Sequence, residues 1–145
     1  LTEVVSKIRA FVFSSYLGEV TDEFKSSQLE EAIESALSKY GGGSTDYAHS
    51  FSDFLSLCLN DLDKKTTVII LGDARNNFGP DKAFLLKSVY ERSKQVYWLN
   101  PEGKFRWNTG DSIMNTYSAY CTKVFECGTL EQLERVIYKL LKTAA

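Results

Sequence analysis

Short β-branched and apolar runs alternate with helical patterns along the chain, and this alternation constrains the fold more than any other feature. The clearest run is Thr66–Leu71, in which β-branched residues dominate and both faces are apolar. Such runs are typical of strands that are covered on both sides. Strands separated by helices predict right-handed crossovers and a mostly parallel sheet with helices on both faces. We therefore expect residues 1–145 to form one three-layer, Rossmann-like α/β domain.

The other elements are predicted from hydrophobic periodicity, which differs between strands and helices. Further strands are expected at Ile8–Phe13, Leu17–Phe24, Val96–Leu99 and Lys123–Cys127, the second of them as an edge strand after a tight turn. Helices are expected at Leu29–Tyr40, Tyr47–Leu62, Phe84–Tyr90, Ile113–Tyr117 and Leu130–Leu141.

Two of these helices follow residues that can cap an N-terminus. A side-chain oxygen at this position accepts a hydrogen bond from a backbone N–H group that the helix itself leaves unpaired. Thr45 or Asp46 is expected to cap the helix that starts at Tyr47. Asp111 or Ser112 is expected to cap the short helix that follows them.

Composition and charge indicate which kinds of partner the chain can bind and in which cell compartment it is expected. The chain has 145 residues, a formal net charge of -2 and no basic block, so a nucleic-acid backbone is not expected as the main partner. No apolar run approaches the roughly 20 residues that span a bilayer, and no signal peptide is visible, which predicts a cytoplasmic protein. The odd number of cysteines (Cys58, Cys121 and Cys127) and the absence of zinc-knuckle spacing predict buried, reduced thiols.

Polar loops follow several of the predicted strands and helices, and these loops are the best candidates for a site. In open parallel sheets, ligands bind beyond the carboxyl ends of the strands. We expect Ser14–Ser15, Gly43–Asp46 and Gly72–Asn77 to meet there. The Thr45 hydroxyl and the Asp73 carboxylate are oxygen ligands suited to a hard cation, and magnesium needs few protein ligands because it keeps several waters.

Each of these residues also has a purely structural interpretation. Thr45 is an ordinary helix cap by its position, and Asp73 is an ordinary turn former after a strand. Asp46 is interpreted as a cap or a solvated charge, and Arg75 as an ion-pair partner in the same loop. His49, the single histidine, has no obvious nucleophile beside it and is interpreted as a surface residue.

Motifs of enzymes are poorly represented. The Gly41–Thr45 segment lacks the lysine of a phosphate-binding P-loop, and the glycine spacing of a dinucleotide fingerprint is absent. The sequence also has no Gly-x-Ser-x-Gly nucleophile elbow. These observations favour binding over catalysis.

Several of the segments named above also carry a family resemblance, which runs over nearly the whole chain. Together, four segments resemble the CoxE-like family of von Willebrand factor A (VWA) domains: Gly42–Tyr47, Thr66–Asn77, Trp98–Pro101 and Thr109–Ser112. The resemblance implies a VWA fold and, in many members, a metal-ion-dependent adhesion site (MIDAS). Such a site combines an Asp-x-Ser-x-Ser loop with a threonine from a second loop and an aspartate from a third. Carried over by motif, the metal ligands are Thr45 and Asp73, with Ser44 as a neighbour of weaker claim.

The same resemblance implies that the first strand and its Asp-x-Ser-x-Ser loop precede Leu1. Leu1, Val4 and Val5 have the spacing of a helix entered midway, and we interpret the chain as N-terminally truncated. In the family's strand order, the first strand lies between the strands at Ile8–Phe13 and Thr66–Leu71. A retained fragment, a strand from another copy or direct pairing of the two flanking strands could replace it. With one carboxylate and one hydroxyl, this chain alone is expected to bind Mg²⁺ weakly or not at all.

The function implied by the resemblance is metal-assisted protein binding. In this interpretation, a partner protein offers a carboxylate that completes the cation's coordination. CoxE-like proteins resemble partners of MoxR-type AAA+ ATPases in metalloenzyme maturation, so such an ATPase or its client is the expected partner. Two alternatives stay open: a small magnesium-dependent phosphoryl-transfer enzyme that uses Asp73, and a scaffold that binds no metal.

Overall fold

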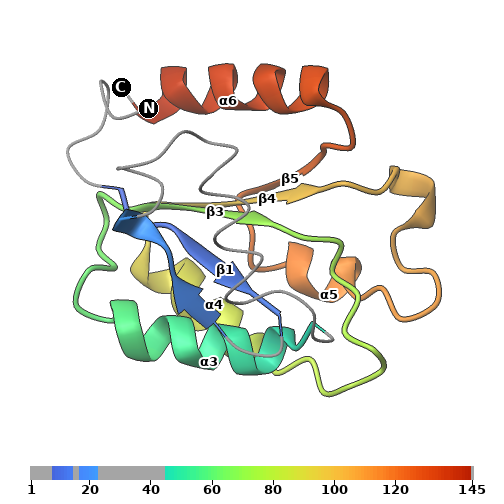
Figure 1. Cartoon of the computed structure of the whole chain (residues 1–145), viewed down its shortest axis with the longest axis horizontal. Coiled ribbons are helices and arrows are strands. Elements are labelled where there is room, and N and C mark those ends of the chain that lie inside the picture. The colour runs from blue at the N-terminus through green and yellow to red at the C-terminus, as the bar shows by residue number, and fades with distance from the viewer. Residues whose placement is uncertain (1–7, 15–16, 23–44, 145) are drawn as a thin grey trace.

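Three layers make up the part of the chain that the structure describes. The computed structural model describes residues 8–14, 17–22 and 45–144. Helix α6 (Leu130–Ala144) covers one face of a parallel sheet, and the other face is covered by helices α3 (Tyr47–Cys58), α4 (Ala83–Arg92) and α5 (Met114–Ser118) (Figure 1). The predicted α/β architecture with helices on both faces is confirmed.

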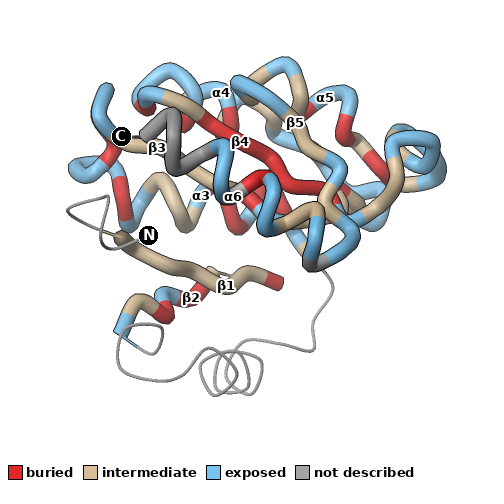
Figure 2. The backbone as a smooth tube through the Cα atoms, turned by 90° about the horizontal axis from the view of Figure 1, so that it is seen from above, coloured by how far each residue is buried: buried red, intermediate tan, exposed pale blue. Residues whose placement is uncertain are grey.

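Strand β4 (Gln95–Asn100) is the central strand of this sheet. It pairs in parallel with β3 (Thr67–Leu71) on one side and with β5 (Lys123–Glu126) on the other. Residues 96–100 are all buried, which gives the strand its continuous red colour in Figure 2. Among the described strands, β3 lies at the edge of the sheet, and its last residue Leu71 is 57% exposed. The run with the strongest strand pattern is therefore not the most buried strand, because burial depends on the neighbours that pair with it.

Strands β1 (Phe11–Phe13) and β2 (Leu17–Glu19) form a separate antiparallel hairpin, in which Phe13 pairs with Leu17. Within the described residues, β1 pairs with β2 and not with β3. Direct pairing of the strands that flank the family's first strand, one of the arrangements left open by the sequence, therefore does not occur. A pocket separates β1 from β3 instead.

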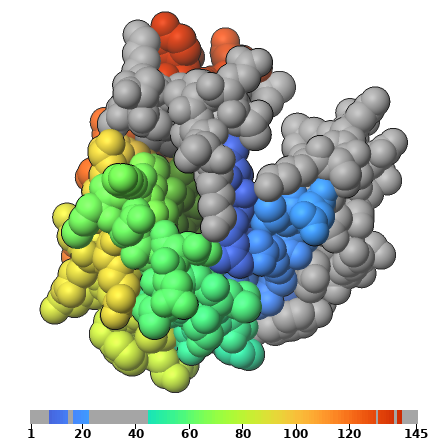
Figure 3. Space-filling model, turned by 90° about the vertical axis from the view of Figure 1, so that its left-hand side faces the viewer, coloured from blue at the N-terminus to red at the C-terminus, as the bar shows by residue number. Residues whose placement is uncertain are grey.

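Aromatic side chains attach this hairpin to the rest of the domain. The rings of Phe11 and Phe54 lie 5.5 Å apart, and those of Phe13 and Tyr47 lie 5.4 Å apart. Arg9 adds ion pairs to Glu19 on the hairpin and to Asp61 beyond helix α3. Figure 3 shows the blue hairpin lying against the blue-green helix α3. The hairpin is therefore held mainly through side chains, whereas β3 is held to β4 by a backbone ladder.

An aromatic cluster between the sheet and its helices fixes the start of α3. The rings of Trp98 and Tyr117 stack with centroids 5.4 Å apart, and the ring of Tyr47 lies 5.6 Å from that of Trp98. Tyr47, Trp98 and Tyr117 are each at most 1% exposed. Pairs of this kind contribute about 0.5–1.5 kcal/mol each beyond the burial of their surface. The first residue of α3 is therefore anchored in the core, next to the ends of the strands.

Several predicted boundaries differ from the structure. The strands expected at Ile8–Phe13 and Leu17–Phe24 are shorter in the structure, with three residues each. Helix α3 ends at Cys58 rather than at Leu62. The predicted cap of α5 is wrong: its N-cap is Ile113, with no side-chain hydrogen bond. Asp111 and Ser112 instead bind other groups, since Asp111 pairs with Arg75 and the Ser112 hydroxyl accepts from the N–H of Asn108. The helix expected at Leu29–Tyr40 lies outside the described residues.

Two further predictions concern the burial of the cysteine thiols and the hydrophobicity of the helices. The three cysteines are thiols, as predicted; Cys58 is buried and the other two are half-buried. Burial raises the pKa of the Cys121 thiol to about 12, so this thiol stays protonated at neutral pH. In the part of the chain that the structure describes, none of the helices combines the length and hydrophobicity needed to cross a bilayer.

Candidate functional site

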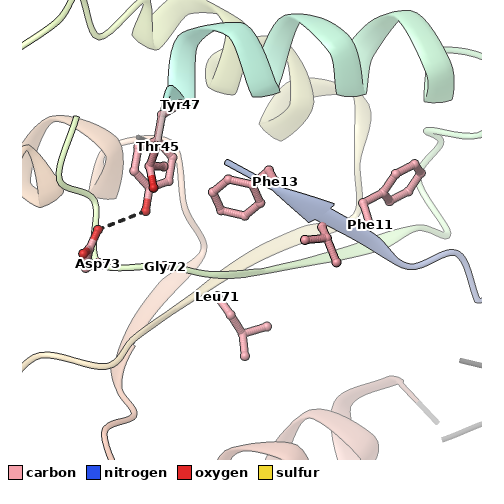
Figure 4. A pocket seen from close by; sticks show the side chains of 8 residues that line it. Phe11, Phe13, Thr45, Tyr47, Leu71, Gly72 and Asp73 are labelled. Carbon is pink, nitrogen blue, oxygen red and sulfur yellow. Dashed lines mark hydrogen bonds between the residues drawn. The ribbon is translucent and has the colours of Figure 1, made fainter. Parts of the chain in front are cut away.

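A pocket opens between strand β1 and the carboxyl end of strand β3 (Figure 4). It has a volume of about 340 Å³, enough for a hydrated cation together with a side chain of a partner. One part of its lining is apolar and comes from both strands, while the other part is polar and comes from the two loops that meet there. The lining residues are Phe11, Val12, Phe13, Thr45, Tyr47, Leu71, Gly72 and Asp73.

The loops that end at this pocket are joined by hydrogen bonds, and they meet as the sequence predicted, although β1 belongs to an antiparallel hairpin and not to the parallel sheet. The N–H of Asp46 donates to the carbonyl oxygen of Ser14 at 2.8 Å, which joins the end of β1 to the start of α3. The side-chain amide of Asn77 donates to the carbonyl oxygen of Thr45 at 3.4 Å, which joins the start of α3 to the loop after β3. Thr45 and Asp73 therefore face one pocket although 28 positions separate them in the sequence.

Thr45 does not cap helix α3. The N-cap is Asp46, whose carboxylate accepts a hydrogen bond from the N–H of His49 at 2.9 Å. The Thr45 hydroxyl makes no hydrogen bond with any described residue, and the residue is half-buried in the pocket lining. The interpretation of Thr45 as the helix cap is thus wrong, because the carboxylate of Asp46 already accepts the hydrogen bond from the first turn of the helix. The hydroxyl oxygen is left available to a ligand.

Among the described residues, only one carboxylate oxygen of Asp73 accepts hydrogen bonds. Its Oδ1 atom accepts from the N–H of Arg75 at 2.9 Å, the two-residue contact of an Asx turn, and from the hydroxyl of Tyr47 at 3.3 Å. Its Oδ2 atom accepts no hydrogen bond from any described residue. The turn-forming interpretation is confirmed, and it occupies one oxygen while leaving the second free.

Tyr47 links the start of α3 to the loop after β3, a role that the sequence did not reveal. Its hydroxyl accepts from the buried N–H of Ala74 at 3.0 Å and donates to Asp73 (dashed line in Figure 4). Burial and then the Asp73 charge raise the pKa of this hydroxyl, so it remains a donor at neutral pH. The helical spacing placed Tyr47 correctly on the apolar face of its helix but could not show which group its hydroxyl meets.

Arg75 ties the loop after β3 to the loop after β4. Its guanidinium lies 2.8 Å from Glu102 and 3.0 Å from Asp111, and it also donates to the carbonyl oxygen of Thr109 at 2.9 Å. Arg75 lowers the pKa of Asp111, which stays ionised and accepts from the N–H of Asn77. Arg75 forms ion pairs, as predicted, but the predicted partner is wrong: its guanidinium pairs with Glu102 and Asp111 of other loops, whereas only its backbone N–H donates to Asp73 in its own loop.

Phe78 is held on the outside of the same loop. Its side chain is 82% exposed, and its backbone φ of 58° lies in the left-handed region, as does that of Asn77 at 56°. A bulky residue in this conformation is strained, and strain of this kind concentrates at binding sites. Hydrogen bonds from Asn77 to Asp111 and to Thr45 hold the segment in place. An aromatic side chain is thereby presented to solvent directly after Asn77, the residue that binds Thr45.

The remaining sequence candidates fall outside the pocket or outside the described residues. His49 is on the surface of α3, 54% exposed and 3.4 Å from Asp53, as its surface interpretation predicted. Ser44 lies outside the described residues. Among the described residues, no group of three or more His, Cys, Asp or Glu side chains could hold a metal ion. Thr45 and Asp73 thus offer two hard oxygen donors, a set that fits part of a magnesium site and not a complete one.

Comparisons with known proteins agree with the resemblance seen in the sequence. The profile of one family, described as "VWA domain containing CoxE-like protein", matches residues 1–136. A search of curated proteins finds no match. The family match covers nearly the whole chain, including the loops at the pocket and the elements that carry them.

Proposed function

Because this chain belongs to the family of VWA domain containing CoxE-like proteins, we propose that it is a protein-binding domain that captures a carboxylate of its partner through a divalent cation. Family membership points to a protein-interaction role. The observation that carries the finer proposal is that the Thr45 hydroxyl and Asp73 Oδ2 are both unused within the described protein and both face one pocket.

The donor chemistry selects the class of cation. A hydroxyl and a carboxylate are hard oxygen ligands, which suit Mg²⁺ or Mn²⁺ better than the softer metals that prefer sulfur or imidazole. Ser44, beside Thr45, keeps a weaker claim as a ligand. A cation bound here would supply a positive charge to a partner's carboxylate. The two side chains hold only part of its coordination shell, so we propose that this chain alone binds Mg²⁺ weakly.

The surface next to the pocket suggests what else a partner provides. Phe78 is exposed and conformationally fixed, and aromatic residues of this kind often anchor protein interfaces. We propose that the partner places an apolar side chain against Phe78 while its carboxylate enters the pocket. A MoxR-type AAA+ ATPase, or the metalloenzyme that it helps to mature, is the proposed partner, in the cytoplasm.

The pocket favours binding over the phosphoryl-transfer alternative. Its described lining holds one carboxylate and no histidine, lysine or arginine that could bind a phosphate or move a proton. Turnover of phosphate esters that disappears in Asp73→Asn would support the enzyme instead. A scaffold that binds no metal would hold a partner equally well with and without a chelator.

The proposal is tested most directly with Mn²⁺, which broadens NMR signals of nearby amides even at weak affinity. In the full chain we expect millimolar Mn²⁺, on the order of the affinity of a two-donor site, to broaden the amides of residues 72–74 first. Asp73→Asn should abolish this effect. Glu91→Gln, which removes an exposed carboxylate on α4, is the matched control and should leave it intact. Broadening that persists in Asp73→Asn, or that centres elsewhere, rejects the site.

A further inference from the structure

The Tyr47 hydroxyl is the one side-chain donor that reaches Asp73 among the described residues. The hydroxyl oxygen accepts from the N–H of Ala74, and Ala74 is fully buried, so the backbone holds the hydroxyl in position. A buried tyrosine hydroxyl must also donate, and Asp73 Oδ1 is the acceptor within reach. The direction of this proton is thus fixed toward the carboxylate.

Gly72 makes room for this hydroxyl. A Cβ atom added at Gly72 would lie 2.4 Å from the Tyr47 oxygen, but 3.3 Å from the ring carbon that carries it. The backbone of Gly72 is not in the left-handed region, so the glycine is required by the neighbouring hydroxyl and not by its own conformation. Gly72 and Tyr47 therefore form a matched pair directly before Asp73.

We infer that Tyr47 is the positioning residue of the site: its hydroxyl, seated over Gly72, turns Oδ1 of Asp73 into the protein and presents Oδ2 alone to the pocket. The carboxylate then meets its ligand with a single oxygen. This inference rests on the proposed function only for the nature of that ligand. The orientation of Asp73 is a property of the protein alone and can be measured without any cation.

Three variants of the full chain separate positioning from folding. Tyr47→Phe removes the hydroxyl and keeps the ring. Gly72→Ala pushes the hydroxyl away. The double variant lets alanine occupy the space that the missing hydroxyl leaves, with its Cβ 3.3 Å from the nearest ring carbon, a tight contact that a shift of a few tenths of an ångström relieves. Tyr90→Phe, an exposed tyrosine on α4, is the matched control.

Two readouts follow Asp73. Three-bond couplings should show one χ1 rotamer in the wild type and in Tyr90→Phe. In Tyr47→Phe, where the N–H of Arg75 is the one remaining donor to Oδ1 among the described residues, the population of that rotamer should fall. The dissociation constant for Mn²⁺ should rise about tenfold in Tyr47→Phe, the usual effect of losing a group that orients a ligand. Gly72→Ala should lower the Tm more than Tyr47→Phe does. The double variant should recover the Tm of Tyr47→Phe but not the Mn²⁺ affinity.

The outcomes distinguish this inference from the proposed function. If Asp73 keeps one rotamer in Tyr47→Phe, or if the double variant regains wild-type Mn²⁺ affinity, Tyr47 does not position the carboxylate, even when Mn²⁺ binds at Asp73. If Asp73 loses its fixed rotamer while Mn²⁺ never binds there, the positioning role stands and the cation site is rejected.

Discussion

The two sides of the pocket are built in different ways. On the β3 side, the loop after the strand is tied down by polar contacts, with Arg75 at their centre and Glu102 and Asp111 as its partners. On the β1 side, the hairpin lies against α3 mainly through the rings of Phe11 and Phe13. The β3 side carries the carboxylate of Asp73, and its orientation is set by directional bonds. The β1 side contributes an apolar wall to the pocket, and the side chains of this wall do not need a fixed orientation.

This difference has a physical origin. The loop after β3 contains Ala74, Asn77 and Phe78 with positive φ, a conformation that local sequence does not favour in residues other than glycine. Hydrogen bonds from distant loops must therefore hold it. Apolar packing is non-directional, so the hairpin tolerates small shifts without losing its contacts.

The largest effect is expected from the β1 side. Phe13→Ala removes the ring that packs on Tyr47 and should lower the free energy of unfolding by about 2 kcal/mol, less than for a fully buried ring because Phe13 is half-buried. Chemical denaturation measures this change. Phe84→Ala, at a side chain that is 63% exposed, is the control and should change the stability little. Equal losses in both variants would mean that the hairpin is not held by its aromatic contacts.

On the β3 side, Arg75→Met should destabilise only the rim of the pocket, meaning the two loops that Arg75 joins (residues 74–77 and 109–112). The rest of the domain should stay folded. Removal of the guanidinium leaves Glu102 and Asp111 close together without their shared cation. We expect amide hydrogen exchange to accelerate about tenfold at residues 74–77 and 109–112, with little change in β4. Lys87→Met, which breaks the exposed pair with Glu91, serves as the control. Uniform acceleration over the whole sheet would contradict a local role.

The same ion pair predicts how the rim responds to acid. Arg75 lowers the pKa of Asp111 below its ordinary value of 3.8, so the pair stabilises the folded state fully above that pH. The contribution is lost as the pH falls through the lower folded pKa. Stability measured between neutral pH and pH 2 should therefore fall less steeply in Arg75→Met than in the wild type. A steeper fall in the variant would show that the pair does not couple to protonation.

The smallest effect, and one of opposite sign, is expected at Phe78. Phe78→Gly relieves the left-handed backbone strain and should raise the free energy of unfolding by about 0.5 kcal/mol. Phe105→Gly is the matched control, because that side chain is 85% exposed but its φ is not positive. The control should be neutral or slightly destabilised. Destabilisation of Phe78→Gly would mean that the aromatic ring, and not a partner, explains the conformation.

The hydrophobic pattern of the sequence predicted the bounds of the strands on the β3 side well and the bounds of those on the β1 side less well. The strand expected at Thr66–Leu71 is observed at Thr67–Leu71, and the strand expected at Val96–Leu99 at Gln95–Asn100. Long apolar runs and helical spacing are local properties, so sequence alone identifies them. The strand expected at Ile8–Phe13 is shorter, because a hairpin strand extends only as far as its partner pairs with it.

The candidate site was predictable in its residues and not in its geometry. The rule that ligands bind beyond the carboxyl ends of parallel strands selected the loop of Asp73, and the oxygen chemistry of the neighbouring polar loop, together with the family resemblance, added Thr45. Their role as metal ligands stays a prediction. The sequence did not show that Asp46 takes the helix cap and so frees Thr45, because the two neighbours suit that position almost equally.

By itself, the sequence determined the order of strands and helices, the α/β class and the loops in which oxygen-bearing residues occur. The tertiary structure alone decided that β4 is the central strand, that Tyr47 lies over Gly72, and that one oxygen of Asp73 is turned inward. The reason is that each of these facts joins residues about 25 or more positions apart. Such contacts depend on how strands pair and on which rotamers fit the packed core, and no local pattern records either.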